Sequence, residues 1–231
     1  MNVQTINRTD QLEAVCERIR IAPRIGLDTE FHNERSYTAR LMVIQLAFED
    51  GFAIVDPLAI LDLKPLAQAL CERTIVGHAL SSDLKIFADK FDCVPSDVFD
   101  CQVAAAFLGY GMSISLADLV REITGVRLKK SQTVSDWSTR PLTEHQIEYL
   151  IDDVAHLLAM QDRLTERLRA TGRSEWAAEE SAQLAQIERY RTDPKRLYMR
   201  ISGASRMNRR ELGVLCEVAV LRDEIAARRD L

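Results

Sequence analysis

The chain has 231 residues, of which 47% are hydrophobic and 28% are charged, and its formal net charge is −5. This composition is that of an ordinary globular protein, long enough for one sizeable domain with an appendage or for two small domains. No apolar run approaches the roughly 20 residues that span a bilayer, and the N-terminus lacks the pattern of a signal or transit peptide, so we expect a cytoplasmic protein. Five scattered cysteines without a CxxC pair argue against structural zinc and against a disulfide framework.

The first half of the sequence alternates between extended and helical patterns. Thr9 is the expected N-cap of a first amphipathic helix, Ser81 is the expected cap of a later one, and the turn at 49–51 predicts an antiparallel hairpin. The expected elements are helix 9–20, strands 24–31, 41–48 and 52–56, helix 63–72, strand 74–78, helix 81–91, strand 98–100 and helix 102–108.

The second half is mainly helical. A helix at 115–124 is followed by a polar, basic connector at 125–141. Thr143 and Gln146 then fit a capping box, and the apolar spacing that follows predicts one continuous helix as far as Leu164.

The order of these elements indicates the fold class. Two or three strands come first and strands then alternate with helices, which predicts an α/β domain with a mixed sheet. Residues 173–190 and 208–230 are again helical. We therefore expect a catalytic domain over residues 1–171 and a helical C-terminal extension over residues 172–231.

Four acids in three separate segments, together with one tyrosine, are candidates for catalysis. Asp28 and Glu30 are two residues apart on an expected strand, so both side chains point to the same face of it. Asp83 follows a strand at the first turn of a helix, and Tyr149 and Asp153 share one face of a helix because they are four residues apart. Each has an ordinary alternative: a solvated strand end, an acid that interacts with the helix dipole, or a solvated helix face.

The charge of these acids points to a metal site, because carboxylates brought together repel one another unless cations lie between them. Oxygen-rich sites suit Mg²⁺ or Mn²⁺, and two such ions can promote displacement at a phosphate. The pattern therefore predicts metal-dependent cleavage of a phosphodiester. The net charge of −5 does not exclude a nucleic-acid substrate, because four of the negative charges are the proposed ligands and two divalent ions would offset them.

Five ordered stretches between about residues 24 and 170 carry a family resemblance. They are IGLDTEF, LMVIQLA, IVGHALSSDLKIF, VFDCQVAAAFLGYGMSISLADLV and KKSQTVSDWSTRPLTEHQIEYLIDDVAHLL. Their order and spacing resemble the DEDD superfamily of 3′–5′ exonucleases, in the branch whose third motif carries tyrosine, and within it the ribonuclease D-like proteins.

The resemblance implies an RNase H-like fold, with a mixed five-stranded sheet flanked by helices. It also implies two Mg²⁺ or Mn²⁺ ions. Asp28, Glu30 and Asp153 would hold the ion that activates water, Asp28 would be shared with the second ion, and Asp83 would act mainly through outer-shell contacts. Tyr149 would orient the attacking water, since a phenol with a pKa of about 10 is a poor base near neutral pH.

Two further residues lie close to these motifs and have two interpretations each. Phe31 would stack on the terminal base or pack in the core, and His78 would contact the substrate or form part of the structure. Among the neighbouring acids, Asp100 is expected to cap a helix, and Asp152 to be a structural or surface charge.

The basic connector before the tyrosine-bearing helix is a candidate for RNA binding. Arg140, Lys129 and Lys130 could follow the phosphate backbone, with Trp137 as a stacking surface. The alternative is a solvated loop that Trp137 anchors.

The expected activity is that of a 3′–5′ exoribonuclease that releases nucleoside 5′-monophosphates from single-stranded RNA 3′ ends, in the trimming of tRNA precursors and other small RNAs. A 3′–5′ exonuclease that prefers DNA and a non-catalytic RNA-binding module are the alternatives, since no motif identifies a contact to the 2′-hydroxyl. The presence of all four acids and Tyr149 disfavours the non-catalytic module. The segment from Ile201 onward resembles only the approach to an HRDC domain, so we expect no complete HRDC domain.

Overall fold

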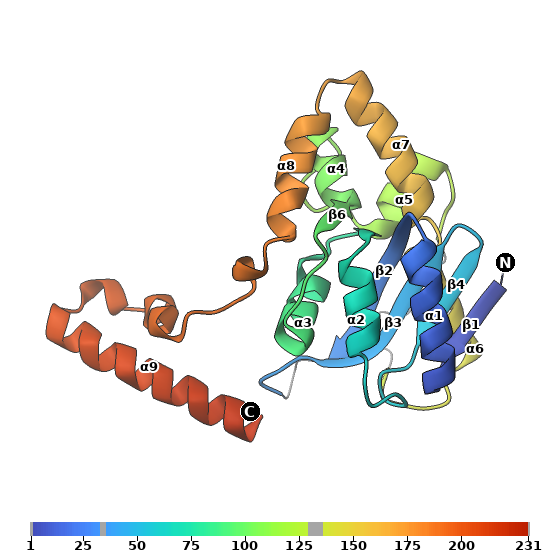
Figure 1. Ribbon diagram of the computed structural model, residues 1–231. Helices are drawn as coiled ribbons and strands as arrows, with labels where there is room; N and C mark the ends of the chain where they lie inside the picture. Colours follow the sequence, from blue (N-terminus) through green and yellow to red (C-terminus); the bar gives the residue numbers. More distant parts are fainter. Residues whose placement is uncertain (1, 33–35, 129–135, 231) are drawn as a thin grey trace.

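A mixed β-sheet forms the centre of the computed structural model, which describes residues 2–32, 36–128 and 136–230 (Figure 1). Its strands run in the order β1-β4-β3-β2-β5-β6. Strand β3 is antiparallel to β2 and β4, whereas the pairs β1–β4, β2–β5 and β5–β6 are parallel. The strands are β1 (Asn2–Ile6), β2 (Arg24–His32), β3 (Arg40–Phe48), β4 (Gly51–Val55), β5 (Thr74–Gly77) and β6 (Asp97–Asp100).

Helices cover both faces of the sheet. Helices α1, α2 and α3 form one hydrophobic cluster with one face, whereas α4, α5, α7 and α8 form a second cluster on the other face, where α6 also lies against β2 and β3. The helices are α1 (Thr9–Ile21), α2 (Lys64–Cys71), α3 (Ser81–Phe91), α4 (Cys101–Phe107), α5 (Leu116–Thr124), α6 (Glu144–Val154), α7 (Leu157–Ala170), α8 (Ser174–Leu184) and α9 (Arg209–Arg229). None of the described helices is both long and apolar enough to cross a membrane.

The C-terminal segment extends away from the sheet after α8 (Figure 1). Three short 3₁₀ turns, η1 (Ile187–Arg189), η2 (Pro194–Arg200) and η3 (Ala204–Arg206), lead into α9. Helix α9 packs on η2 and stands apart from the sheet in Figure 1. Its last turn still contacts the rest of the chain, because Asp230 accepts hydrogen bonds from the backbone and hydroxyl of Thr38.

The structure confirms the expected α/β fold with a mixed sheet, and it adds one strand. The described residues form a six-stranded sheet rather than the expected five-stranded one, because β1 pairs with the edge of β4. Strand β1 is polar and only Ile6 is buried, so it lacks the apolar alternation by which a strand is recognised.

The continuous helix expected between Thr143 and Leu164 is wrong, because the chain forms two helices there. Helix α6 ends at Val154 and α7 begins at Leu157. After the break Leu157 lies against β2, where a Cβ added to Gly26 would come within 3.5 Å of it. The apolar spacing continues through the break, and neither glycine nor proline marks it.

The two expected caps at Thr9 and Ser81 are also wrong, since both are the first residues of their helices. The N-cap positions belong to Arg8 and Leu80, which make no side-chain capping hydrogen bond. The capping box of Thr143 and Gln146 is confirmed.

Asp100 is the helix cap that the sequence predicts, and it does more than cap α4. It is only 2% exposed, and its carboxylate accepts hydrogen bonds from the backbone of Gln102 and Val103 in α4. It also accepts from the backbone of Ala79 and Leu80, in the turn between β5 and α3. Ala79 has a φ of 58°, a left-handed conformation that is costly for alanine, so these bonds hold a strained turn in place.

We predict that Asp100→Ala lowers the free energy of unfolding by about 3 kcal/mol, because it leaves buried backbone N–H groups without acceptors. Urea unfolding followed by circular dichroism measures this change. Asp97→Ala, at the exposed start of the same strand, is the matched control and should cost much less. Equal losses in the two variants would contradict the role of Asp100.

Candidate active site

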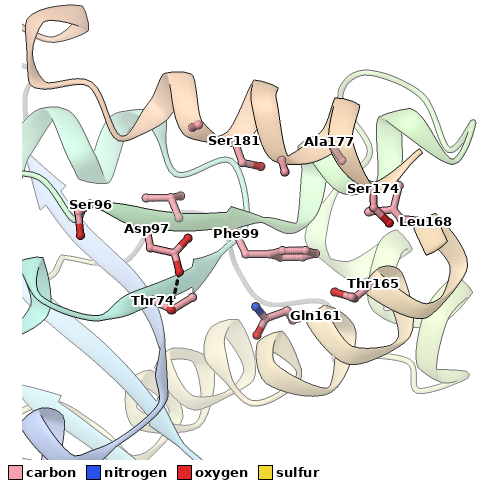
Figure 2. A pocket seen from close by; sticks show the side chains of 13 residues that line it. Thr74, Ser96, Asp97, Phe99, Gln161, Thr165, Leu168, Ser174, Ala177 and Ser181 are labelled. Atoms are coloured by element: carbon pink, nitrogen blue, oxygen red, sulfur yellow. Dashed lines mark hydrogen bonds between the residues drawn. The ribbon is translucent and has the colours of Figure 1, made fainter. Parts of the chain in front are cut away.

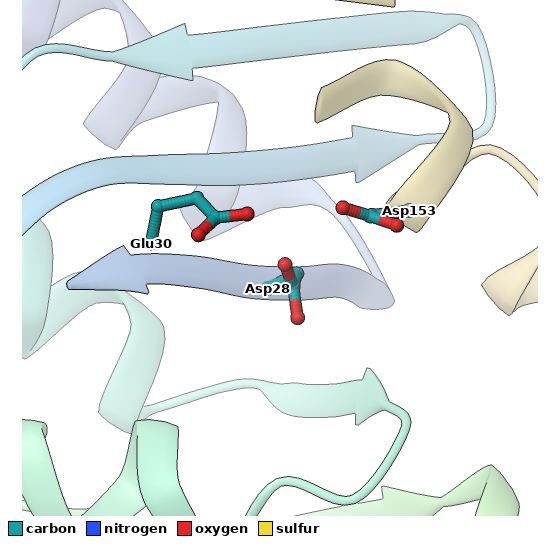
Figure 3. A group of neighbouring side chains, drawn as sticks. All are labelled: Asp28, Glu30 and Asp153. Atoms are coloured by element: carbon teal, nitrogen blue, oxygen red, sulfur yellow. The ribbon is translucent and has the colours of Figure 1, made fainter. Parts of the chain in front are cut away.

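Three of the predicted acids meet at one point between the sheet and α6. Asp28, Glu30 and Asp153 each offer a carboxylate oxygen, and these oxygens lie within 4.8 Å of one another. Figure 3 shows the three side chains pointing toward one another, two from β2 and one from α6. We call these three residues the acid cluster.

The local sequence explains why these side chains converge. Residues 28 and 30 alternate with buried Leu27 and Thr29, so both acids project to the face of β2 that α6 covers. On α6, Leu150 and Val154 are buried, which turns Asp153 toward the strand.

Tyr149 lies beside the acid cluster. It is four residues before Asp153 on α6, and the two side chains lie close enough for each to shift the pKa of the other. Burial and the nearby acids raise the Tyr149 pKa above its ordinary value. The phenol therefore stays protonated near neutral pH and can orient a group by hydrogen bonding, but it cannot act as a base.

The cluster is electrostatically costly as long as nothing compensates its charge. Burial, followed by repulsion from Asp153 and Asp83, raises the pKa of Glu30 to about 8. Burial also raises the pKa of Asp153 to about 7 and, together with the other acids, holds that of Asp28 well above its usual range. Protons neutralise this site in the absence of cations, and a divalent cation would do the same with more charge.

Asp83 lies near the acid cluster, but its carboxylate is held by a hydrogen bond from another side chain. It is 5% exposed in the first turn of α3, and its carboxylate accepts a hydrogen bond from the Thr29 hydroxyl. Burial raises its pKa to about 6, and its charge in turn raises that of Asp28. Asp83 is not part of the acid cluster found among the described residues, so an indirect contribution to a metal site remains the prediction for it.

Two predicted substrate-binding residues are Phe31, which lies in β2, and His78, which directly follows β5. Phe31 is partly buried, packs against the hydrophobic cluster beneath α1–α3 and also lines a cleft. His78 is mostly buried, and its Nε2 lies 3.0 Å from the carbonyl oxygen of Ile114. Burial lowers the His78 pKa, so the ring is neutral near neutral pH. His78 therefore has a structural contact, and a role in substrate binding remains a prediction.

Arg140 holds the connector to the sheet. Its guanidinium donates five hydrogen bonds, to both carboxylate oxygens of Asp56 and to the carbonyls of Met42, Trp137 and Thr139. A guanidinium has five N–H donors, so all of them are used. The phosphate contact expected for Arg140 would require these bonds to break, and the structure instead gives this side chain an anchoring role.

Trp137 is an anchor as well, since it is 7% exposed and packs in a small hydrophobic cluster with Leu150. Its ring centroid lies 5.6 Å from that of Tyr149, which supports the tyrosine from one side. The expected stacking of Trp137 on RNA bases would need a surface that is mostly covered here. Lys129 and Lys130, also expected to follow the phosphate backbone, lie outside the described residues.

A cleft of about 830 Å³, lined by Phe31 among others, was not predicted from the sequence. One wall comes from residues 36–39 and from α3, and the other comes from the C-terminal segment through Tyr190, Arg200 and Asp223. These segments are far apart in the chain, so no local pattern connects them. In the sequence, only the basic residues of the C-terminal segment could have indicated that this segment forms part of a cleft.

A second cavity, of about 320 Å³, lies between β6, α7 and α8 at the other end of the sheet (Figure 2). Its lining is mostly apolar and hydroxyl-bearing, and Phe99 projects into it. Its one acid, Asp97, already accepts a hydrogen bond of 2.6 Å from the Thr74 hydroxyl. This cavity lacks the acid cluster, so the chemistry belongs to the site between β2 and α6.

Comparisons with known proteins agree with this geometry. Residues 3–169 match a family model described as 3′–5′ exonuclease. The chain is 39% identical over 236 residues to ribonuclease D of Escherichia coli strain K12, covering 100% of this chain and 62% of that protein. It is 40% identical over 226 residues to ribonuclease D of Gluconacetobacter diazotrophicus, covering 96% and 57% of the two chains.

A solved structure of Escherichia coli ribonuclease D, described as an exoribonuclease involved in structured RNA processing, matches with a TM-score of 0.92 at 38% identity. The match covers 100% of this chain and 62% of that one. The chain thus spans about three fifths of the length of the relatives it matches.

The raised pKa values predict how stability depends on pH when no metal is bound. Between about pH 4 and pH 8 the folded protein binds more protons than the unfolded chain, so its stability falls as the pH rises. Asp153→Asn removes one titrating acid while it mimics the protonated form. We expect it to raise the unfolding temperature at pH 8 and to leave it nearly unchanged at pH 5, as measured by thermal unfolding in EDTA. An equal effect at both pH values would contradict this account.

Proposed function

The chain belongs to the 3′–5′ exonuclease family, as a ribonuclease D-like member, and on this premise we propose that it is a divalent-metal-dependent exoribonuclease. It hydrolyses single-stranded RNA from the 3′ end and releases nucleoside 5′-monophosphates, in the cytoplasm, with tRNA precursors and other small RNAs as substrates. The observation that carries the proposal is the convergence of Asp28, Glu30 and Asp153 within 4.8 Å.

The donor set of this site fits Mg²⁺ or Mn²⁺. All ligands are carboxylate oxygens, which hard divalent cations prefer, and because burial raises the pKa of Glu30 and Asp153, a cation would stabilise their charged forms. Asp28, Glu30 and Asp153 would hold the ions directly, and Asp83 would act through its neighbours. Two ions bound there would lower the pKa of a bound water and stabilise the negative charge on the leaving 3′ oxygen.

The chain's own residues would orient the reactants. The Tyr149 hydroxyl, near Asp153 and with its ring against Trp137, would hydrogen-bond the attacking water. The anchoring of Arg140 to Asp56 holds the connector that leads into α6, so it keeps both α6 residues in position over β2. Positioning of this kind contributes to catalysis because the reacting groups are already aligned when the substrate binds.

The cleft that Phe31 lines is where we propose that a single strand of RNA binds, because Phe31 follows Glu30 directly on β2 and carries the chain from the acid cluster to the cleft. Phe31 can stack on a base there. Arg200 and Arg191 on the C-terminal wall and Lys85 on α3 add positive charge along it. Lys85 and Arg191 already pair with acids, whereas no ion pair of Arg200 occurs among the described residues.

The catalytic assignment is tested with single-stranded RNA and a DNA of matching sequence, both labelled at the 5′ end, in Mg²⁺, Mn²⁺ or EDTA. We expect stepwise shortening of RNA only with metal, a rate about 10³-fold lower in Asp28→Asn, and a loss of about 10²-fold in Tyr149→Phe. Asp152→Asn, beside Asp153 on α6, is the matched control and should keep full activity.

The outcomes separate the alternatives. Full activity of Asp28→Asn, or shortening in EDTA, would overturn the metal site. Binding of RNA without shortening would identify a non-catalytic module. Faster shortening of the DNA would replace the ribonuclease assignment with a DNA exonuclease, since the 2′-hydroxyl is the group that distinguishes the two substrates.

The role of the cleft is tested by Arg200→Ala. We expect KM for single-stranded RNA to rise several-fold at unchanged kcat, and the dependence of KM on salt to weaken by about one phosphate contact. Arg206→Ala, in the exposed turn η3 outside the cleft, is the matched control. Identical salt dependence of the wild type and Arg200→Ala would place the RNA elsewhere.

A further inference from the structure

Gln45 in β3 is a buried amide without a partner. The side chain is 0% exposed, and among the described residues neither its Oε1 nor its Nε2 makes a hydrogen bond. Such a group loses its hydrogen bonds to water on folding and regains nothing, which is why buried polar groups are nearly always paired. Its position in the otherwise apolar strand LMVIQLAF therefore has to be explained by something other than the stability of the core.

The register of the sheet places Gln45 next to the acid cluster. Gln45 is the direct partner of Asp28 on the antiparallel strand β2, so both side chains lie on the same face, with Cβ atoms about 5 Å apart. Glu30 is its diagonal neighbour on that face. On its other side Gln45 pairs with Ile54 of β4, which offers no hydrogen bond. The polar groups within reach along the sheet are thus the two acids.

We propose that Gln45 is a positioning residue for Asp28. Its Nε2–H donates to the Asp28 carboxylate, directly or through one buried water, when that carboxylate is charged, and so fixes its orientation toward a divalent cation. The proposal rests on the proposed function in that it takes Asp28 to be a metal ligand. The buried amide has no other partner among the described residues, so its donors are available for this bond.

An amide has the right chemistry for this task. A lysine or arginine at position 45 would bring a positive charge that competes with the cation, and an acid would add to the repulsion in the cluster. The neutral amide donates hydrogen bonds, does not compete with the cation and does not add to the repulsion among the acids. Groups that orient a metal-binding side chain in this way typically change metal affinity by about 10–100-fold when they are removed.

The test substitutes Gln45→Met, which keeps the length and volume of the side chain and removes the amide. We expect the dissociation constant for Mn²⁺, measured by calorimetry without RNA, to rise about 10-fold. In EDTA we expect the unfolding temperature to rise by roughly 2–4 °C, because the unpaired amide is gone. Gln45→Leu should act in the same direction, which guards against a packing effect specific to methionine.

Gln161→Met is the matched control, because it makes the same change at a glutamine whose Oε1 accepts a hydrogen bond of 2.9 Å from Arg24. It should lower the unfolding temperature and leave Mn²⁺ binding unchanged. If both Gln45 variants bind Mn²⁺ as tightly as the wild type, the positioning role is overturned and the proposed function stands. If the wild type itself binds no Mn²⁺, the proposed function is overturned with it.

Discussion

Repulsion among partly buried carboxylates is the constraint on which the arrangement of this protein depends. Asp28 and Glu30 on β2 and Asp153 on α6 would separate if the strand and the helix were free to move, because each raises the energy of the others. The sheet prevents this on one side, since β2 is hydrogen-bonded to β3 and β5. On the other side, α6 has to be held in place so that Asp153 cannot move away from β2.

Several contacts that look unrelated in the sequence fix that helix. The capping box of Thr143 and Gln146 sets the first turn of α6, and Arg140 ties the preceding connector to β3 and to Asp56 after β4. Trp137 fills the space between the connector and Tyr149. On the opposite face of β2, Asp100 holds the turn before α3 and thereby places Asp83. Most polar contacts near the site therefore serve position rather than chemistry.

The sequence predicts the geometry correctly where it depends on the spacing of residues within one element. The two-residue spacing of Asp28 and Glu30 and the capping box at Thr143 each depend on one element, and the structure has them as predicted. The prediction failed where partners are distant. Strand β1 is defined by its pairing with β4 and not by its polar residues, and Arg140 looked free because the carboxylate and carbonyls that bind it come from other segments. No glycine or proline in the sequence marks the break between α6 and α7.

The protons held by the acid cluster have a consequence for how the protein would take up metal. Glu30 and Asp153 have pKa values raised to about 8 and about 7, so near neutrality Glu30 is mostly protonated and Asp153 about half, and a bound cation would displace these protons. Metal binding would therefore exchange protons for the cation, and its apparent affinity would rise with pH. If a divalent cation binds at this site, a fall in pH would drive the exchange backward and weaken binding at a constant metal concentration. The acids that would hold the metal would thus also make the occupancy of the site depend on pH.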